Sequence, residues 1–331
     1  MIDVNTHSKS LKNINYIDLF AGIGGFRLAL DSFGASCVFT SEWDKHSQDV
    51  YIKNFGDEPD GDITKIKEKD IPKHDMLFAG FPCQSFSISG KQKGFDDSRG
   101  TLFFDIARIA KYHKPKFMIL ENVKNILTID NGKTLKTIRK VLEEDLNYSV
   151  IVKLLKGNDF GVPQQRERVF FICFHKSLKV KNFELSKPDL NYLSVRDILE
   201  EGRFPELEIN RRDILIDKEP PKKDLLSNFP NKPIRIGTIN KGGQGERIYH
   251  IDGTGITLSA HGGGPGKKTG AYLINKKIRR LTPRECARMM GFPDSFKISS
   301  SPTQAYTQFG NAVIVNVVQF IIKDLLNKKI I

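Results

Sequence analysis

Short apolar runs alternate with helical patterns over the first half of the chain. Apolar, β-rich runs occur at 14–20, 37–40, 76–79, 117–120, 149–155 and 169–174, and helical patterns at 25–33 and 44–54. This alternation predicts an α/β fold, a parallel sheet with helices on both faces. Ligands bind such sheets at the carboxyl ends of the strands. Polar residues that directly follow a run are therefore the first candidates for a site.

The alternation is lost beyond residue 178. Residues 178–232 are rich in Lys, Asp, Glu and Pro, and glycine dominates 237–270, which predicts turns over a smaller, mostly β scaffold. Thr282-Pro283-Arg284-Glu285 opens a helix with a cap, a proline and an acid, and 316–328 is amphipathic. We expect one domain from 1–192 with 310–331, a second from 193–277, and a hinge over 278–309.

Composition narrows the class of protein. The 331 residues are 39% hydrophobic and carry a net charge of +13, which favours a nucleic-acid partner, although a solubilising lysine surface is an alternative. The four cysteines form no C-x-x-C pair, so no disulfide framework and no metal are expected. No apolar run approaches the roughly 18 residues of a membrane span, and 1–13 lack the apolar core of a signal peptide. We expect a cytoplasmic protein without a membrane partner.

Cys83 is the first chemical candidate. It lies in Gly80-Phe81-Pro82-Cys83, directly after the apolar run 76–79, so we expect it at the carboxyl end of a strand. A lone cysteine is more often a small buried hydrophobic residue. It becomes a nucleophile only as a thiolate, which requires a positive or hydrogen-bonding environment.

A glycine-rich turn follows the first run, in Asp18-Leu19-Phe20-Ala21-Gly22-Ile23-Gly24-Gly25. It lacks the full G-x-G-x-x-G of dinucleotide enzymes, which weakens a nicotinamide oxidoreductase hypothesis. Glu42 ends the next run and is placed to reach ribose hydroxyls. Trp43 either stacks on an adenine or belongs to the core. Because the turn has no phosphate-binding lysine, it suits S-adenosylmethionine.

Two further segments carry candidate polar groups. Glu121 ends the run 117–120, on the same expected rim as Cys83, and is a candidate acid for a ring nitrogen. Arg166 and Arg168 precede the run 169–174 and are candidates to bind a carbonyl or support the cysteine electrostatically. Surface carboxylates and salt-bridged arginines are the ordinary alternatives for all three.

The ordered set of motifs resembles that of the DNA cytosine-5 methyltransferases, over nearly the whole chain. It comprises 18–22, Pro82-Cys83-Gln84, Glu121-Asn122-Val123, 165–168, 280–285 and 308–313. In addition, 241–249 resembles the recognition region of a bacterial member that targets GCGC. Ala312 and His261 depart from the family pattern, which expects serine and tyrosine there.

The resemblance implies a mechanism and a set of roles. Cytosine C5 would be methylated from S-adenosylmethionine, giving S-adenosylhomocysteine, after thiolate addition to C6 of a cytosine flipped out of duplex DNA. The catalytic residues would be Cys83, Glu121, Arg166 and Arg168. The cofactor pocket, in a Rossmann-like sheet, would be lined by Phe20, Gly22, Ile23, Gly25, Glu42, Trp43, Asp62, Ile63, Pro82, Leu102 and Asn311. The DNA-binding residues, mostly in the small recognition domain, would be Ser89, Gln244, Glu246, Arg247 and Thr257.

The resemblance also implies a cellular setting. The protein would be a monomer of the bacterial cytoplasm, associated with the nucleoid, in a restriction system whose endonuclease acts independently on the same site. A tRNA methyltransferase of the same family shares the catalytic motifs and remains an alternative, with a nicotinamide-dependent oxidoreductase as the other. An adenine amino-methyltransferase is disfavoured because no Asn-Pro-Pro-Tyr-like motif is present.

Overall fold

The computed structural model describes residues 10–82, 102–180, 183–219 and 231–331. The chain divides into two compact units, each described here by itself. Unit 2 comprises residues 3–155, 167–186 and 321–331, and unit 1 comprises 1–2, 156–166 and 187–320. The functional division into catalytic domain, recognition domain and hinge remains a prediction.

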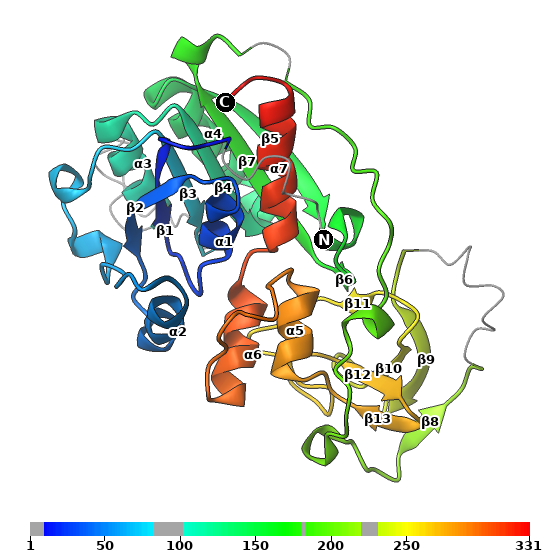
Figure 1. Ribbon diagram of the computed structural model, residues 1–331. Coiled ribbons are helices and arrows are strands. Elements are labelled where there is room, and N and C mark those ends of the chain that lie inside the picture. Colours follow the sequence, from blue (N-terminus) through cyan, green and yellow to red (C-terminus); the bar gives the residue numbers. More distant parts are fainter. Residues whose placement is uncertain (1–9, 83–101, 181–182, 220–230) are drawn as a thin grey trace. The chain divides into compact units, whose positions relative to one another are not determined.

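Unit 2 is built on a six-stranded sheet in the order β2-β1-β3-β4-β7-β5 (Figure 1). Its strands are β1 (Asn15–Leu19), β2 (Ser36–Ser41), β3 (Met76–Gly80), β4 (Phe117–Val123), β5 (Tyr148–Lys156) and β7 (Glu167–His175). The pairs β1–β2, β1–β3 and β3–β4 are parallel, whereas β4–β7 is antiparallel. The predicted parallel arrangement is confirmed for β1 to β4, and β7 is an antiparallel addition to it. This strand follows β5 through the short connection 157–166, which holds no crossover α-helix of the kind that parallel neighbours need.

Helices cover both faces of this sheet, as predicted. Its α-helices are α1 (Gly25–Asp31), α2 (Lys45–Phe55), α3 (Leu102–His113) and α4 (Lys133–Lys140). Phe78 contacts Phe26 of α1 with ring centroids 5.6 Å apart. Its neighbours Leu77 and Ala79, which point to the opposite face, belong to the core cluster that includes Phe103 of α3. Since side chains alternate along a strand, α1 and α3 pack on opposite faces.

Unit 1 contains a second, smaller sheet in the order β13-β12-β10-β9-β8 (Figure 1). Its strands are β8 (Ile214–Ile216), β9 (Ile234–Ile239), β10 (Arg247–His250), β12 (Ala271–Ile274) and β13 (Lys277–Arg279), and a separate two-stranded sheet joins β6 (Gln164–Gln165) to β11 (Gly255–Ile256). Ile236, Ile239 and Ile248 form the centre of its core and are fully buried. The predicted small, mostly β scaffold is thus present.

The predicted helix start at Thr282 is also confirmed. Helix α5 (Pro283–Met289) has a capping box in which the Thr282 side chain accepts from Glu285 N and the Glu285 carboxylate accepts from Thr282 N. That carboxylate also forms a bidentate ion pair with Arg279, at 2.7 and 2.8 Å. Because Arg279 ends β13, the pair ties the small sheet to α5.

The last two helices are α6 (Pro302–Asn311) and α7 (Val315–Asn327). Together they form, among the described residues, one stretch that by length and composition could cross a membrane. This stretch is not one continuous apolar run, because α6 and α7 are separated by a short break and polar residues such as Asn311 and Asn316 lie within it. In addition, 72% of its most apolar window is buried inside the protein, which is the pattern of a core helix.

Candidate active site

Polar residues gather at the carboxyl ends of the parallel strands in unit 2. β1 ends at Leu19, β2 at Ser41 and β3 at Gly80, and all three strands run parallel beside β4. The chain segments that follow β1, β2 and β3 therefore leave the same edge of the sheet, and Glu121 lies at this end of β4. This edge is where ligands bind in open α/β sheets.

Glu121 and Arg168 form an ion pair at this edge. Arg168 Nε lies 3.0 Å from Glu121 Oε1, with side chains only 17% and 11% exposed. The two residues come from adjacent antiparallel strands, in which Arg168 pairs with Val123 and Glu121 with Phe170. Burial lowers the pKa of Arg168, and the Glu121 carboxylate acts in the opposite direction. A guanidinium retains its proton under such shifts, so the edge holds an acid oriented by a fixed cation.

The strand that leads to Cys83 lies beside this pair. Gly80 is the β3 partner of Glu121, and Glu121 Oε2 would lie 3.7 Å from a Cβ placed on Gly80. Asn122 Nδ2 donates to Phe81 O at 2.9 Å, and Asn122 Oδ1 accepts from Val123 N at 2.8 Å. The buried Asn122 amide therefore holds the end of β3 against β4. Two predicted site residues, Cys83 and Ser89, lie outside the described residues.

The glycine-rich turn after β1 is held against the end of β2 by Glu42. Gly22 N donates to Glu42 Oε2 and Asp44 N to Glu42 Oε1, both at 2.8 Å. Burial raises the pKa of Glu42, while these hydrogen bonds act to lower it. Phe20 and Gly22 both have a φ of 57°, and, apart from its two chain neighbours, no described residue has an atom within 4 Å of a Cβ built on Gly22. The left-handed turn thus leaves open space beside an oriented carboxylate.

Trp43 is not a core residue, because 80% of its surface is exposed. An exposed indole next to the oriented Glu42 carboxylate is available to stack on a planar ligand. Ile63 is buried, and Asp62 accepts from Thr64 N at 3.0 Å, so this carboxylate caps a short 3₁₀ helix, Ile63–Lys65. Thr64 lowers the pKa of Asp62 through these hydrogen bonds.

The remaining predicted cofactor residues have different surroundings. Ile23 and Gly25 are buried at the start of α1, Pro82 is exposed, and Leu102 is the first residue of α3. Asn311, the last residue of α6, belongs to unit 1 and is exposed. Six of the predicted cofactor residues (Phe20, Gly22, Ile23, Glu42, Trp43, Pro82) therefore lie just after the ends of β1, β2 and β3 within unit 2.

Arg166 has a different environment from Arg168. It is 2% exposed and lies in unit 1. Its guanidinium donates to Gly310 O at 2.9 Å, to Ala312 O at 3.0 Å and to Leu258 O at 3.2 Å. These carbonyls flank Asn311 and follow Thr257, so the geometry gives Arg166 a positioning role for both segments. Its predicted catalytic role remains a prediction.

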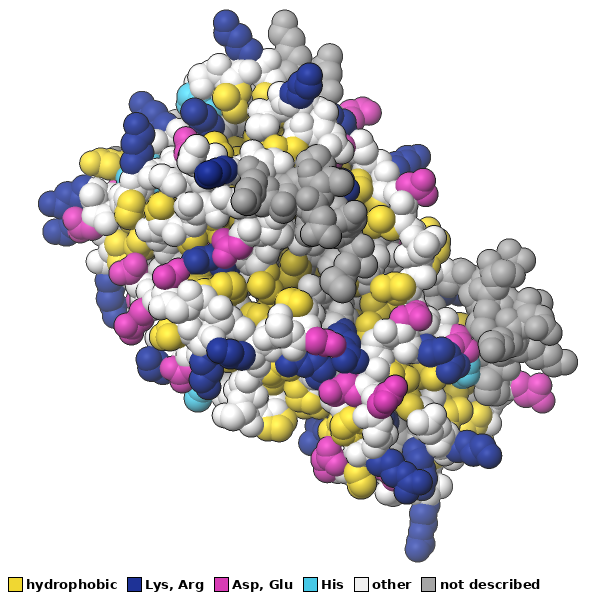
Figure 2. All heavy atoms as spheres, viewed as in Figure 1, with side chains coloured by type: hydrophobic (Ala, Val, Ile, Leu, Met, Phe, Trp, Pro, Cys, Tyr) yellow, Lys and Arg dark blue, Asp and Glu magenta, His cyan; other side chains and the backbone are white. Residues whose placement is uncertain are grey.

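Of the predicted DNA-reading residues of unit 1, Gln244, Arg247 and Thr257 are exposed and Glu246 is half-buried. Gln244 and Glu246 lie in the loop 240–246 between β9 and β10, and Arg247 begins β10. Thr257 follows β11, and its hydroxyl donates to Gln165 O. In the face shown in Figure 2, Lys and Arg side chains are spread over both units and interleaved with Asp and Glu. The net charge of +13 therefore does not form one patch on this face.

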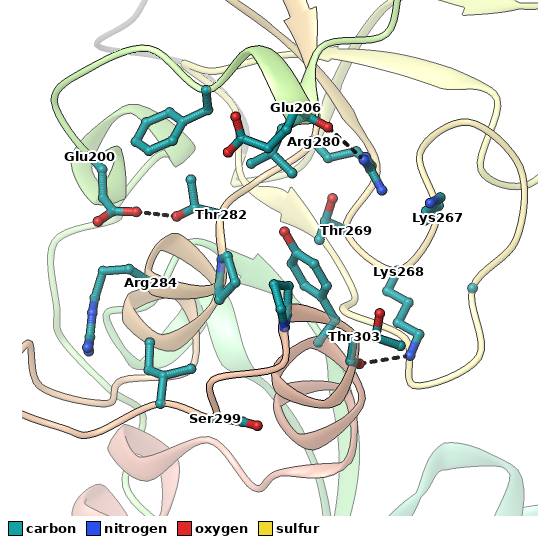
Figure 3. A pocket seen from close by; sticks show the side chains of 17 residues that line it. Glu200, Glu206, Lys267, Lys268, Thr269, Arg280, Thr282, Arg284, Ser299 and Thr303 are labelled. Carbon is teal, nitrogen blue, oxygen red and sulfur yellow. Dashed lines mark hydrogen bonds between the residues drawn. The ribbon is translucent and has the colours of Figure 1, made fainter.

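Unit 1 also contains a cavity of about 700 Å³. Figure 3 shows its walls, which come from the segment 200–207, the loop 262–269 and the starts of α5 and α6. Arg280 donates to Glu206 O, Lys268 to Thr303 O, and Thr282 to the Glu200 carboxylate. Arg280 and Lys268 thus have protein acceptors, and none of the predicted site residues that the structure describes lines the cavity.

Comparison with known proteins identifies the class of enzyme. The family model of C-5 cytosine-specific DNA methylases matches residues 14–327. The chain belongs to this family and is a DNA (cytosine-5-)-methyltransferase of the Type II kind. The family is S-adenosylmethionine-dependent.

Particular relatives are similar over almost the whole chain. The Type II methyltransferase M.HhaI of Haemophilus parahaemolyticus is 53% identical over 97% of this chain and 96% of its own length. M.HpaII of Haemophilus parainfluenzae is 44% identical over 96% and 90%. Among solved structures, the S. pombe Dnmt2 methyltransferase has a TM-score of 0.69 at 20% identity, covering 96% of this chain and 99% of its own. A putative DNA modification methyltransferase from an E. coli prophage has a TM-score of 0.69 at 22% identity, covering 95% and 99%. These structures share the fold.

Sequence reasoning assigned no function to Asn122 or Asp44. In the sequence, Asn122 stands out only as part of a motif, although a polar amide at the end of a buried strand indicates a hydrogen bond across strands. Asp44 caps α2 by accepting from Ser47 N at 2.9 Å while its own N–H holds Glu42. An Asp directly before a helical pattern is a recognisable cap.

Proposed function

We propose that this enzyme methylates C5 of the inner cytosine of GCGC in duplex DNA, with Cys83 as nucleophile. The observation that carries the chemistry is the Glu121–Arg168 pair at the carboxyl end of β4, beside the strand that leads to Cys83. An acid and a fixed cation at this edge suit a ring nitrogen and a carbonyl oxygen of one base.

The roles follow from the electronic properties of cytosine. C5 is too weak a nucleophile to take a methyl group unaided, and thiolate addition at C6 directs electron density to C5. Glu121 protonates or hydrogen-bonds N3, and Arg168 binds the carbonyl oxygen, so both stabilise the charge that addition creates. After transfer, a base removes the C5 proton and the thiolate leaves. The cytosine must first leave the stack, which costs roughly a few kcal/mol.

The residues around the glycine-rich turn fit S-adenosylmethionine. The Glu42 carboxylate, held by two backbone N–H groups, is an acceptor suited to ribose hydroxyls, and the exposed Trp43 ring suits adenine. The space beside Gly22 leaves room for the ligand. Phe20, Ile63 and Asp62, with Ile23, Gly25, Pro82, Leu102 and Asn311, complete the proposed pocket. When bound, S-adenosylmethionine supplies an electrophilic methyl group on a sulfonium.

Target reading is assigned to the loop 240–246 and its neighbours. Arg247 suits bidentate binding of guanine in the major groove, and Gln244 suits a second base. Ser89 and Gln244 would fill the gap left by the flipped cytosine, and Thr257 would support its backbone. The GCGC assignment rests on the likeness of 241–249 to a GCGC-specific recognition region.

The proposed setting is a restriction-modification system of the bacterial cytoplasm. The enzyme acts there as a monomer on nucleoid DNA, while an endonuclease of the same specificity acts independently. The names of the relatives M.HhaI and M.HpaII, both Type II methyltransferases, support this setting.

Bisulfite sequencing of DNA methylated by the purified enzyme tests the proposed function. We expect protection at the inner cytosine of GCGC, with no methyl transfer to tRNA. Methylation confined to another sequence would overturn the GCGC assignment, and transfer to tRNA alone would overturn duplex DNA as the substrate.

A further inference from the structure

The loop 240–246 has a backbone that only certain residues adopt easily. It joins β9 to β10, which pair in antiparallel register with Arg247 opposite Thr238. Asn240, Gly242 and Gly245 have φ values of 51°, 75° and 80°. Left-handed positions suit glycine and, less well, asparagine. A loop of this composition loses much conformational entropy on ordering, so something must hold it in shape.

The Glu246 carboxylate joins two parts of this loop. Its Oε1 accepts from Asn240 Nδ2 at 2.9 Å, and its Oε2 accepts from Gly243 N at 2.8 Å. In the backbone, Glu246 O accepts from Ile239 N at 2.7 Å, and Glu246 N donates to Gly243 O at 3.1 Å. Both ends and the middle of the loop therefore converge on one residue.

The second glycine-rich segment supports the loop from another side. Gly266 N donates to Gly245 O at 2.8 Å, and a Cβ on Gly245 would lie 2.2 Å from Gly263 O. Arg247 Nε donates to Gly242 O at 3.3 Å. The backbone that carries Gln244 is thus fixed on both sides before any DNA is bound.

We infer that Asn240 is a positioning residue for target reading, acting through Glu246. The Asn240 amide holds the Glu246 carboxylate, which in turn fixes the backbone of 243–245. Gln244 and Arg247 can then contact the bases without the loss of conformational entropy that ordering the loop on binding would cause. Both carboxylate oxygens of Glu246 accept hydrogen bonds from within the loop. Glu246 therefore fixes the conformation of the loop, in addition to its proposed place beside the bases. This inference rests on the proposed function of the loop in reading DNA.

The substitution Asn240→Gly isolates the amide. Glycine adopts the φ of 51° without strain, so the backbone is kept while the donor is lost. Asn240→Asp keeps the side-chain shape but sets a carboxylate against Glu246. Asn275→Gly is the matched control, because Asn275 has a φ of 49° in the turn between β12 and β13, outside the loop.

The readout is discrimination, measured as kcat/KM on a GCGC duplex divided by kcat/KM on a duplex altered at one guanine. Loss of one typical intramolecular hydrogen bond predicts a fall in discrimination of about 3- to 10-fold for Asn240→Gly. Discrimination by the Asn240→Asp variant should fall at least as far, and discrimination by the Asn275→Gly variant should equal that of the wild type. In a Glu246→Ala background, Asn240→Gly should cause no further fall.

The outcomes separate the two proposals. If Arg247→Ala lowers discrimination but Asn240→Gly does not, the positioning role is overturned while the proposed function stands. If Asn240→Gly lowers discrimination as much in the Glu246→Ala background as in the wild type, the proposal that Asn240 acts through Glu246 would also be overturned. If the wild type shows no preference for GCGC, the proposed function itself fails.

Discussion

Arg168 Nε lies 3.0 Å from Glu121 Oε1, between two neighbouring strands whose register places Glu121 beside Gly80. The pair is largely shielded from water, so the electrostatic interaction between the two charges is stronger than it would be on an open surface. Removing either partner would leave the other charge buried and unpaired, which would carry a desolvation cost. The pair is therefore both the electrostatic centre of the proposed site and a link between β4 and β7.

Replacing Glu121 by glutamine should slow methyl transfer strongly. Glutamine keeps the size of the side chain and loses the proton that the proposed mechanism places on cytosine N3. General acid catalysis contributes roughly 100-fold or more, so kcat should fall by at least that factor. Single-turnover transfer of labelled methyl groups measures it, with thermal unfolding as the control for folding. A glutamine variant with wild-type kcat would remove Glu121 from the chemistry.

Replacing Trp43 by alanine should weaken S-adenosylmethionine binding without destabilising the fold, since the side chain is 80% exposed. Stacking of an aromatic ring on a base is worth about 1–3 kcal/mol, which corresponds to a rise in Kd of about 5- to 150-fold. Calorimetry measures the Kd. Trp43 is the single tryptophan of the chain, so its fluorescence should also respond to the ligand.

The matched control is Tyr112→Ala, which removes another exposed aromatic ring, 60% exposed and located on α3. This variant should bind the cofactor with the wild-type Kd. Equal Kd values for the wild type and the Trp43 variant would contradict the stacking role.

The described cysteines should resist alkylation at neutral pH. Burial raises the pKa of Cys37 to about 11, and burial also raises the pKa of Cys173 and Cys286. A thiol whose pKa is raised in this way stays protonated at pH 7, whereas the thiolate is the reactive form. Iodoacetamide at pH 7 should therefore label Cys83, with loss of activity. Peptide mass mapping that finds the label on Cys37 instead would contradict this selectivity.

Much of the fold could be predicted because its signals are local. The run 76–79 is apolar on both faces of a strand, and Thr282-Pro283-Arg284-Glu285 contains its own cap, so both appeared where expected. The direction of β7 could not be predicted in this way. It depends on which strand β7 pairs with, and the length of the connection 157–166 alone does not fix that partner.

The site was predictable as a set of residue types and less so as a set of contacts. Glu121 is predicted on the same rim as Cys83, and Glu42 at a strand end, from their positions after apolar runs. In contrast, Arg166 and Arg168 are two residues apart in the sequence, and one binds backbone carbonyls while the other pairs with a carboxylate. Side chains two residues apart on one strand share a face, but Arg166 lies between β6 and β7 whereas Arg168 lies within β7, so this rule does not apply to the pair. Only the tertiary structure decides what each side chain contacts.

Covalent trapping tests the central claim, that Cys83 adds to cytosine in the target. A GCGC duplex with 5-fluorocytosine at the inner position cannot release the enzyme after methyl transfer, since fluorine takes the place of the proton that must leave. With S-adenosylmethionine, the wild type should form a stable complex whose DNA-linked peptide contains Cys83, and Cys83→Ser should bind the duplex without forming it. A complex linked through any other residue, or formed equally well by the serine variant, would contradict the account.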